Sequence, residues 1–483
     1  MNRRKLLGYL GSGVCCALGG RASYALQGLS GSSVPVQIRV NEDRVFGSIP
    51  RDFIGLGYEI SSVARSGLLS ATNRVYVELV RTLGTAGVIR VGGNTADYAS
   101  YSAKGKAVSA PKATIVNRES LRELRSFLDA TGWRLIWGLD LGQSTVDEVV
   151  EEAQVVSTMM GGKLLAFEIG NEPDLFAHEG HRQGSYTFER YLGEYQRYKS
   201  AIRAKVPGAP FAGPDVAGHT DWVPRFAAAE RNDLKLLTHH YYRGGQDYRG
   251  GQGPDSSYAM LLNPDPKLVS TLQSLQRASV EANGLPYRIC ETNSFSGGGR
   301  PGISGTFGAA LWVLEYLFTL AWHDAAGVNL ETGVNQLDFI SSYSPIGDDE
   351  RGTYTPEPEY YGMLAFGQAS DGKRIAAEAS KGPVNISCYA VKQGRKVIVT
   401  VINKDRTAHA MVDLRCRSRI GKATAVRLEA PALESSTGMT LAGASVTAGG
   451  HWKPGRAETL QASAMGARID LSPGSAALVT LMV

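Results

Sequence analysis

The chain has 483 residues, of which 43% are hydrophobic and 20% charged, and its formal net charge is +5. This composition is that of a folded globular protein, and the length exceeds the usual size of a single domain. Segment 1–25 holds four basic and no acidic residues, so the rest of the chain has a net charge of +1. Such a balance gives no reason to expect binding to nucleic acid or to another polyanion.

The first 25 residues are predicted to be an export signal. Arg3-Arg4-Lys5 forms a charged region of the bacterial twin-arginine type, and residues 6–20 are apolar but too few to span a bilayer. Small residues at 23–25 suit cleavage. We therefore expect a mature protein that begins near residue 26, is not held in a membrane, and resides in the periplasm or outside the cell. Its cysteines are expected to be free, with a Cys388–Cys416 pair left open.

Residues 49–372 alternate between strand and helix patterns. Each apolar run of strand length is followed by a stretch with apolar residues at helical spacing. The predicted strands are 53–59, 88–91, 135–139, 164–169, 211–214, 234–240, 287–291 and 328–330. Eight strand–helix units predict a (β/α)8 TIM barrel with right-handed crossovers.

The pattern changes at about residue 373. From there to residue 483, short strand candidates are separated by turn residues, which is typical of a β-sandwich. Residues 34–40 alternate apolar and polar side chains but have no partner in a barrel, so segment 26–48 is assigned to the sandwich. The predicted fold class is α/β, a TIM barrel with a C-terminal β-sandwich domain.

Two of the predicted barrel strands end in a carboxylate. Strand 164–169 is followed by Asn171 and Glu172, and strand 287–291 ends in Glu291. Side chains at the C-terminal ends of barrel strands face the mouth of the barrel. Retaining glycoside hydrolysis needs two such carboxyl groups, because one protonates the leaving oxygen while the other attacks the anomeric carbon. The pair therefore predicts a glycosidase.

The two strand-end motifs, Ile169-Gly170-Asn171-Glu172-Pro173 and Glu291-Thr292-Asn293-Ser294, resemble glycoside hydrolase family 79, which contains heparanases and bacterial β-glucuronidases. Further stretches resemble the family in the same order along the chain, namely 58–59, 90–95, 238–242, 297–299 and 358–362. The resemblance implies a secreted, retaining exo-β-glucuronidase that acts on a carbohydrate substrate without a cofactor.

The resemblance also implies roles for individual residues. Glu172 corresponds to the acid/base, Glu291 to the nucleophile, and Asn171 to the residue that holds the sugar 2-hydroxyl. Tyr241 is expected to donate a hydrogen bond to Glu291 and keep it ionised. The other implied substrate contacts are Glu59 and Asn94 for sugar hydroxyls, and the backbone of Gly297 and Gly298 with the hydroxyls of Tyr343 and Tyr360 for the uronate carboxylate.

The chain departs from the family at two positions. Ser296 stands where a tyrosine is frequent, and Glu331 ends the last barrel strand where related bacterial enzymes have histidine. These differences leave open a retaining glycosidase for a neutral sugar or a modified uronate. An endo-acting, heparanase-like enzyme and a carbohydrate-binding protein on an inactive barrel are further alternatives; the intact pair of glutamates disfavours the last. His239 and His240 lack a third ligand at suitable spacing, so no metal is expected.

Overall fold

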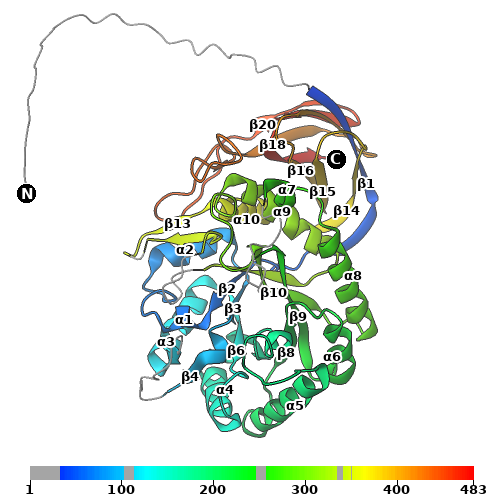
Figure 1. Ribbon diagram of the computed structural model, residues 1–483. Coiled ribbons are helices and arrows are strands. Elements are labelled where there is room, and N and C mark those ends of the chain that lie inside the picture. The colour runs from blue at the N-terminus through cyan, green and yellow to red at the C-terminus, as the bar shows by residue number, and fades with distance from the viewer. Residues whose placement is uncertain (1–32, 103–113, 246–256, 334–340, 350) are drawn as a thin grey trace, which may run out of the picture.

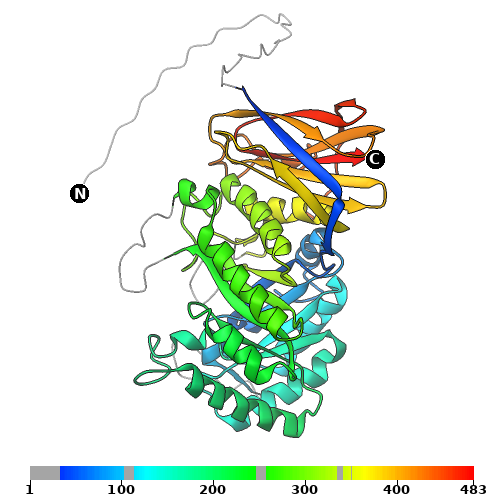
Figure 2. The ribbon, with the colours of Figure 1, turned by 90° about the vertical axis from the view of Figure 1, so that its right-hand side faces the viewer.

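The computed structural model describes residues 33–102, 114–245, 257–333, 341–349 and 351–483. The predicted signal at residues 1–25 lies outside these ranges. The chain folds into a barrel with a sheet domain stacked on one side of it (Figures 1 and 2). Among the described helices, none combines the length and the apolar character needed to cross a membrane.

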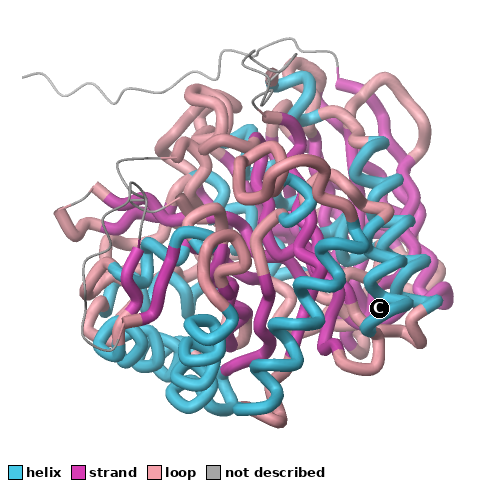
Figure 3. Tube along the Cα trace, turned by 60° about the horizontal axis from the view of Figure 1, so that its bottom comes forward, coloured by secondary structure: helices cyan, strands magenta, loops and turns pink. Residues whose placement is uncertain are grey.

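Eight parallel strands close into the barrel, which confirms the predicted fold class. Neighbouring strands follow one another along the chain, and the last pairs with the first through Leu330 and Leu56. The strands, seen inside the ring of helices in Figure 3, are β2 (Gly55–Glu59), β3 (Val88–Gly92), β6 (Arg134–Leu139), β7 (Leu164–Ile169), β8 (Phe211–Val216), β9 (Leu234–Gly244), β10 (Tyr287–Phe295) and β11 (Gly327–Glu331).

The helices bury apolar faces against these strands, as the sequence spacing predicts. The side chain of Asn117 caps α3, and the side chain of Thr145 caps α4. The helices are α1 (Ile60–Ala64), α2 (Arg74–Leu83), α3 (Arg118–Thr131), α4 (Val146–Met160), α5 (Phe188–Lys205), α6 (Trp222–Glu230), α7 (Tyr258–Leu262), α8 (Pro266–Glu281), α9 (Phe307–Trp322) and α10 (Pro358–Ala369), with short 3-10 turns at Ala96–Tyr98, Gly161–Lys163 and Pro173–Leu175.

The second unit is one continuous sheet that curls on itself into the sandwich. Its first strand, β1 (Ser33–Ser48), lies between β14 and β17. The other strands are β14 (Lys373–Ala379), β15 (Ile386–Gln393), β16 (Lys396–Asn403), β17 (His409–Arg415), β18 (Lys422–Glu429), β19 (Thr440–Leu441), β20 (Glu458–Thr459), β21 (Gln461–Ser463), β22 (Gly466–Leu471) and β23 (Ser475–Met482). Two small ribbons complete the fold, β4 (Ala99–Tyr101) with β5 (Thr114–Val116) and β12 (Ile346–Asp348) with β13 (Tyr354–Pro356).

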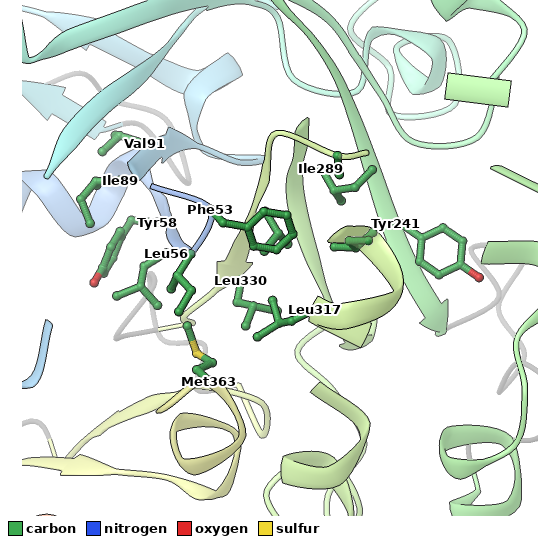
Figure 4. Packing of buried hydrophobic residues seen from close by; sticks show 14 of the residues in the cluster. Phe53, Leu56, Tyr58, Ile89, Val91, Tyr241, Ile289, Leu317, Leu330 and Met363 are labelled. Atoms are coloured by element: carbon green, nitrogen blue, oxygen red, sulfur yellow. The ribbon is translucent and has the colours of Figure 1, made fainter. Parts of the chain in front are cut away.

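One apolar core joins the two units. Helices α9 and α10 lie between the barrel and the sheet, and Phe318 of α9 stacks on Tyr389 of β15 with ring centroids 4.9 Å apart. Figure 4 shows part of this core, where Leu317 and Met363 of these helices pack near Leu330 of the barrel wall. The three cysteines of the described residues, Cys290, Cys388 and Cys416, are free.

Candidate active site

The structure brings Glu172 and Glu291 together at the mouth of the barrel. Both residues are buried, and one oxygen of each carboxyl group lies within 4.8 Å of the other and of a ring nitrogen of His240. Glu172 follows β7 in a left-handed backbone conformation (φ 48°), held by a hydrogen bond from its N–H to the carbonyl of Asp215. For comparison, the two carboxyl groups lie about 5–5.5 Å apart in retaining glycosidases and about 6.5–9.5 Å apart in inverting ones.

Arg90 of β3 lies at the centre of the site, fully buried. Its Nη1 donates to Oε2 of Glu291 at 2.7 Å, and its Nη2 donates to Oδ2 of Asp215 at 2.6 Å and to Oδ1 of Asn171 at 2.7 Å. Its Nε donates to Oε2 of Glu168 at 3.1 Å. One guanidinium therefore positions four groups from three other strands, β7, β8 and β10, and three of its hydrogen bonds are made to carboxyl groups.

His240 of β9 lies beside the acid/base. Its Nδ1 is 2.8 Å from Oε1 of Glu172 and its Nε2 is 2.7 Å from Oδ1 of Asp215. Although burial disfavours the charged ring, the carboxylates of Asp215 and Glu291 raise the pKa of His240 well above its usual range. Burial raises the pKa of Glu172 to about 7, against the opposing effect of the His240 hydrogen bond. Glu172 can therefore hold a proton at neutral pH, as a general acid must.

The tyrosine beside the expected nucleophile is Tyr242, so the prediction for Tyr241 is wrong. The hydroxyl of Tyr242 donates to Oε1 of Glu291 at 3.0 Å, and burial and Glu291 raise the pKa of that phenol well above its usual range. Tyr241 points outward from the same strand, where it stacks near Tyr316 of α9 and donates to Asp265 at 2.7 Å (Figure 4). The reason is the alternation of side chains along a strand.

The predicted hydroxyl-binding residues lie together on the neighbouring strand ends. Glu59, at the end of β2, accepts hydrogen bonds from the backbone N–H groups of Asn94 and Thr95. Asn171 donates to Oδ1 of the exposed Asn94 at 3.2 Å. Burial and the charge of Glu291 raise the pKa of Glu59.

The predicted carboxylate pocket is assembled only in part. Gly297, Gly298 and the next glycine have φ values of 67°, 84° and 86°, which only glycine adopts without strain, and the N–H of residue 342 fixes the turn by donating to the carbonyl of Gly298. Tyr343 is buried, and the centroid of its ring lies 6.3 Å from that of Tyr242. Tyr360 is elsewhere, because its hydroxyl donates to the carbonyl of Leu79 in α2, so that prediction is corrected.

The two positions that depart from the family lie close to this pocket. Glu331 is buried at the end of β11, with a carboxyl oxygen beside Gly57. Burial raises the pKa of the Tyr242 and Tyr343 hydroxyl groups, and the charge of Glu331 acts in the same direction. Ser296 is half-buried beside Gly245. The length of the segment from Ala99 to Val116 also predicts a loop that walls off the cleft of an exo-acting enzyme, but residues 103–113 of it lie outside the described ranges.

A metal ion is not favoured by the chemistry of this cluster. Two sets of ligand-type side chains converge, Glu172 with His240 and Glu291, and Glu168 with Asp215 and Cys290. The Arg90 guanidinium already donates to a carboxylate of each set, so a cation would meet a fixed positive charge.

The sequence prediction missed Arg90, Asp215 and His240 as site residues. Arg90 and His240 stand inside motifs that carry the family resemblance, and Arg90 is a charged residue within an apolar strand, which is a usable signal because buried charges require partners. Asp215 follows a short strand without such a motif, and only the closed barrel shows that it contacts both cations.

Comparison with known proteins identifies the class. No family model matches the chain. Solved glycosidases share its fold: a 4-O-α-L-rhamnosyl-β-D-glucuronidase from Fusarium oxysporum (TM-score 0.75, 19% identity, 92% of this chain and 100% of that chain) and an α-L-arabinofuranosidase from Thermotoga maritima (TM-score 0.68, 14% identity, 93% and 100%). The chain is a TIM-barrel glycoside hydrolase.

Within this class the similar sequences are β-glucuronidases and heparanases, the kind of enzyme grouped in glycoside hydrolase family 79. The β-glucuronidase of Aspergillus niger is 27% identical over 416 residues, which cover 77% of this chain and 75% of the relative. The β-glucuronidase of Neurospora crassa is 27% identical over 379 residues, which cover 68% of this chain and 65% of the relative. Bovine heparanase (Bos taurus) is 26% identical over 281 residues, or 55% of this chain and 48% of the relative.

Proposed function

We propose that the chain is a secreted, retaining exo-β-glucuronidase. The observation that carries this proposal is the pair of buried carboxyl groups, Glu172 and Glu291, whose nearest oxygens lie within 4.8 Å and whose surroundings differ. Glu291 accepts hydrogen bonds from Arg90 and Tyr242, whereas burial favours the protonated form of Glu172. The similarity to proteins named β-glucuronidases supports the substrate class.

The geometry supports a double displacement. Glu291 attacks the anomeric carbon and becomes an ester, while Glu172 transfers its proton to the leaving oxygen. Glu172 is then a carboxylate with the charged His240 ring 2.8 Å away, so the new charge is stabilised where it forms. Glu172 next takes a proton from the water that hydrolyses the ester. Asn171, held by Arg90, is placed to hold the sugar 2-hydroxyl.

Uronate recognition would use the backbone N–H groups of Gly297 and Gly298 and the hydroxyl of Tyr343. Charge-assisted hydrogen bonds of this kind contribute about 1.5–3 kcal/mol each, so the missing tyrosine at Ser296 weakens the pocket without removing it. Glu331 opposes a uronate when it is ionised. The principal alternative is therefore a retaining glycosidase for a neutral sugar or a modified uronate on the same catalytic pair.

Turnover of matched aryl glycosides tests the proposal. The aryl β-glucuronide should be cleaved faster than the β-glucoside, the β-xyloside and the α-arabinofuranoside, and proton NMR should show the β-anomer of glucuronic acid first, because two displacements restore the configuration. Glu291→Ala is the control that abolishes turnover of all substrates. A preference for a neutral sugar would move the assignment to the alternative, and an α-anomer formed first would exclude the proposed nucleophile.

Exo-action and export are separate parts of the proposal, each with its own measurement. An exo-enzyme releases monosaccharide from a glucuronic acid-containing polymer while the polymer length hardly changes; rapid shortening would instead show a heparanase-like endo-enzyme. Export predicts that the native protein begins near residue 26, and an intact Met1 in periplasmic or extracellular protein would contradict cleavage of the signal. A binding protein would retain affinity for glucuronides and show no turnover.

A further inference from the structure

The side chain of Glu168 is a buried carboxyl group that has no role in the double displacement described above. It lies on β7, four residues before Glu172, and its side chain points into the barrel. The residue is fully buried. Its Oε2 accepts from Nε of Arg90 at 3.1 Å, whereas its Oε1 has no hydrogen-bond partner among the residues that the structure describes.

In the buried cluster the carboxyl groups outnumber the cations by two. The cluster combines two cations, Arg90 and His240, with four carboxyl groups, Glu168, Glu172, Asp215 and Glu291. Under the proposed function, Glu172 keeps its proton until the leaving group takes it. Asp215 accepts from Arg90 and contacts His240, and although burial opposes it, these two cations lower the pKa of Asp215. Glu291 accepts from Arg90 and Tyr242, and the double displacement needs it as a carboxylate. The charges of these six groups then balance only if Glu168 is protonated as well, because the nearby Arg288 donates to Asn329 and to backbone carbonyls and not to a carboxylate of the cluster.

The surroundings of Glu168 agree with that assignment. A carboxyl oxygen of Glu168, one of Asp215 and Sγ of Cys290 lie within 4.8 Å of one another, so a proton on Glu168 has the Asp215 carboxylate nearby. Burial and the charge of Asp215 raise the pKa of Glu168 to about 7, against the opposing effects of Arg90 and His240. The titratable and charged groups that face it are Arg90 on β3, Asp215 on β8, His240 on β9, Arg288 and Cys290 on β10, and Tyr191 on α5.

We propose that Glu168 works in its neutral, protonated form as the positioning residue of Arg90. Through Oε2 it fixes the plane of the guanidinium, so that Nη1 and Nη2 point at Glu291 and Asp215. Because it carries no charge, it does not compete with Glu291 for the charge of Arg90. An ionised Glu168 would add an uncompensated negative charge beside the nucleophile, which is unfavourable in a buried site.

Substitution by glutamine tests the protonation state, because E168Q copies the shape and the neutrality of the protonated acid. An infrared difference spectrum between the wild type and E168Q should contain the carbonyl stretch of a carboxylic acid below neutral pH, and this band should vanish as the pH rises through about 7. Absence of the band at every pH, with a carboxylate band in its place, would show that Glu168 is ionised and overturn the proposal.

The pH dependence of the melting temperature provides a second measurement that does not depend on activity. A carboxyl group whose pKa is raised on folding binds its proton more tightly in the native state, so its contribution to stability falls as the pH rises from the unfolded pKa through the folded one. The difference in melting temperature, E168Q minus wild type, should therefore increase between about pH 5 and pH 8. The exposed Glu151→Gln is the matched control and should show no such trend; a flat difference for E168Q would contradict a neutral Glu168.

Activity then tests the positioning role. E168A should lower kcat/KM by on the order of 10–100-fold, mainly through kcat, because Arg90 Nε loses its acceptor. E168Q should recover most of this loss, since an amide oxygen accepts the same hydrogen bond. E168Q as inactive as E168A would show that a charge is needed at residue 168. If the wild type cleaves no glucuronide, the proposed function fails, while the infrared and melting measurements still decide the state of Glu168.

Discussion

Removal of a single hydroxyl group separates the roles of two adjacent tyrosines. Tyr242→Phe deletes the O–H that donates to Glu291 at 3.0 Å and keeps the ring that packs near Tyr343. A hydrogen bond to a charged group contributes about 1.5–3 kcal/mol, so kcat/KM for an aryl glucuronide should fall by about 10- to 150-fold.

Tyr241→Phe is the matched control, since it removes the same atom from the next residue. The hydroxyl of Tyr241 donates to Asp265, which also accepts from the N–H of Leu268 and contacts Arg243 at 3.2 Å. We therefore expect kcat/KM within about twofold of the wild type and a loss of stability of about 1 kcal/mol. Steady-state kinetics from acidic to basic pH would measure both variants. A larger loss of activity in Tyr241→Phe than in Tyr242→Phe would refute the assignment of the inward-facing residue.

Three further outcomes follow from the same site. Glu172→Ala should impair substrates with poor leaving groups most, because activated aryl groups need little protonation; equal losses across a leaving-group series would remove Glu172 from the acid/base role. In the wild type, kcat/KM should decline as the pH rises through about 7, since Glu172 then loses the proton that burial retains, and a profile that stays flat to high pH would contradict this. Glu331→Gln should raise kcat/KM for glucuronides, more so at higher pH, and hardly affect glucosides; a loss for glucuronides would show that Glu331 binds the sugar favourably and would support the neutral-sugar alternative.

The sequence predicts the barrel well because its strands are apolar runs separated by amphipathic helices. Within β9, however, the signal for the inward-facing side chains is weak. Leu236 and Leu237 are both apolar, as is usual for a parallel strand buried on both faces, so the alternation is interrupted there. The exposed Lys235 at the start of the strand is the local sign that odd-numbered residues, and so Tyr241, face outward.

Tyr360 illustrates a different limit. It stands in a motif that resembles the family, but its direction depends on how α10 packs against α2 and the sheet domain, where its hydroxyl meets a backbone carbonyl. The glutamates were easier to predict, because a strand end in a barrel already determines where the next side chains lie. Arg90 and Asp215 required the whole closed barrel, since their partners come from different strands.

Strand β1, near the start of the chain, can become ordered only when strands from its C-terminal part pair with it. Ile38 lies opposite Ala379 on one side and Leu414 on the other, so both edges of β1 are paired by strands that follow the entire barrel. During synthesis this strand has unpaired edges until residues 373–415 have been made, and unpaired edges are sites of aggregation and proteolysis. If segment 1–25 directs export of the folded protein, the strand that follows it becomes ordered only in a full-length chain. In a truncated chain the signal would then be followed by an unfolded segment. An export machinery that accepts only folded proteins can reject truncated chains on this ground.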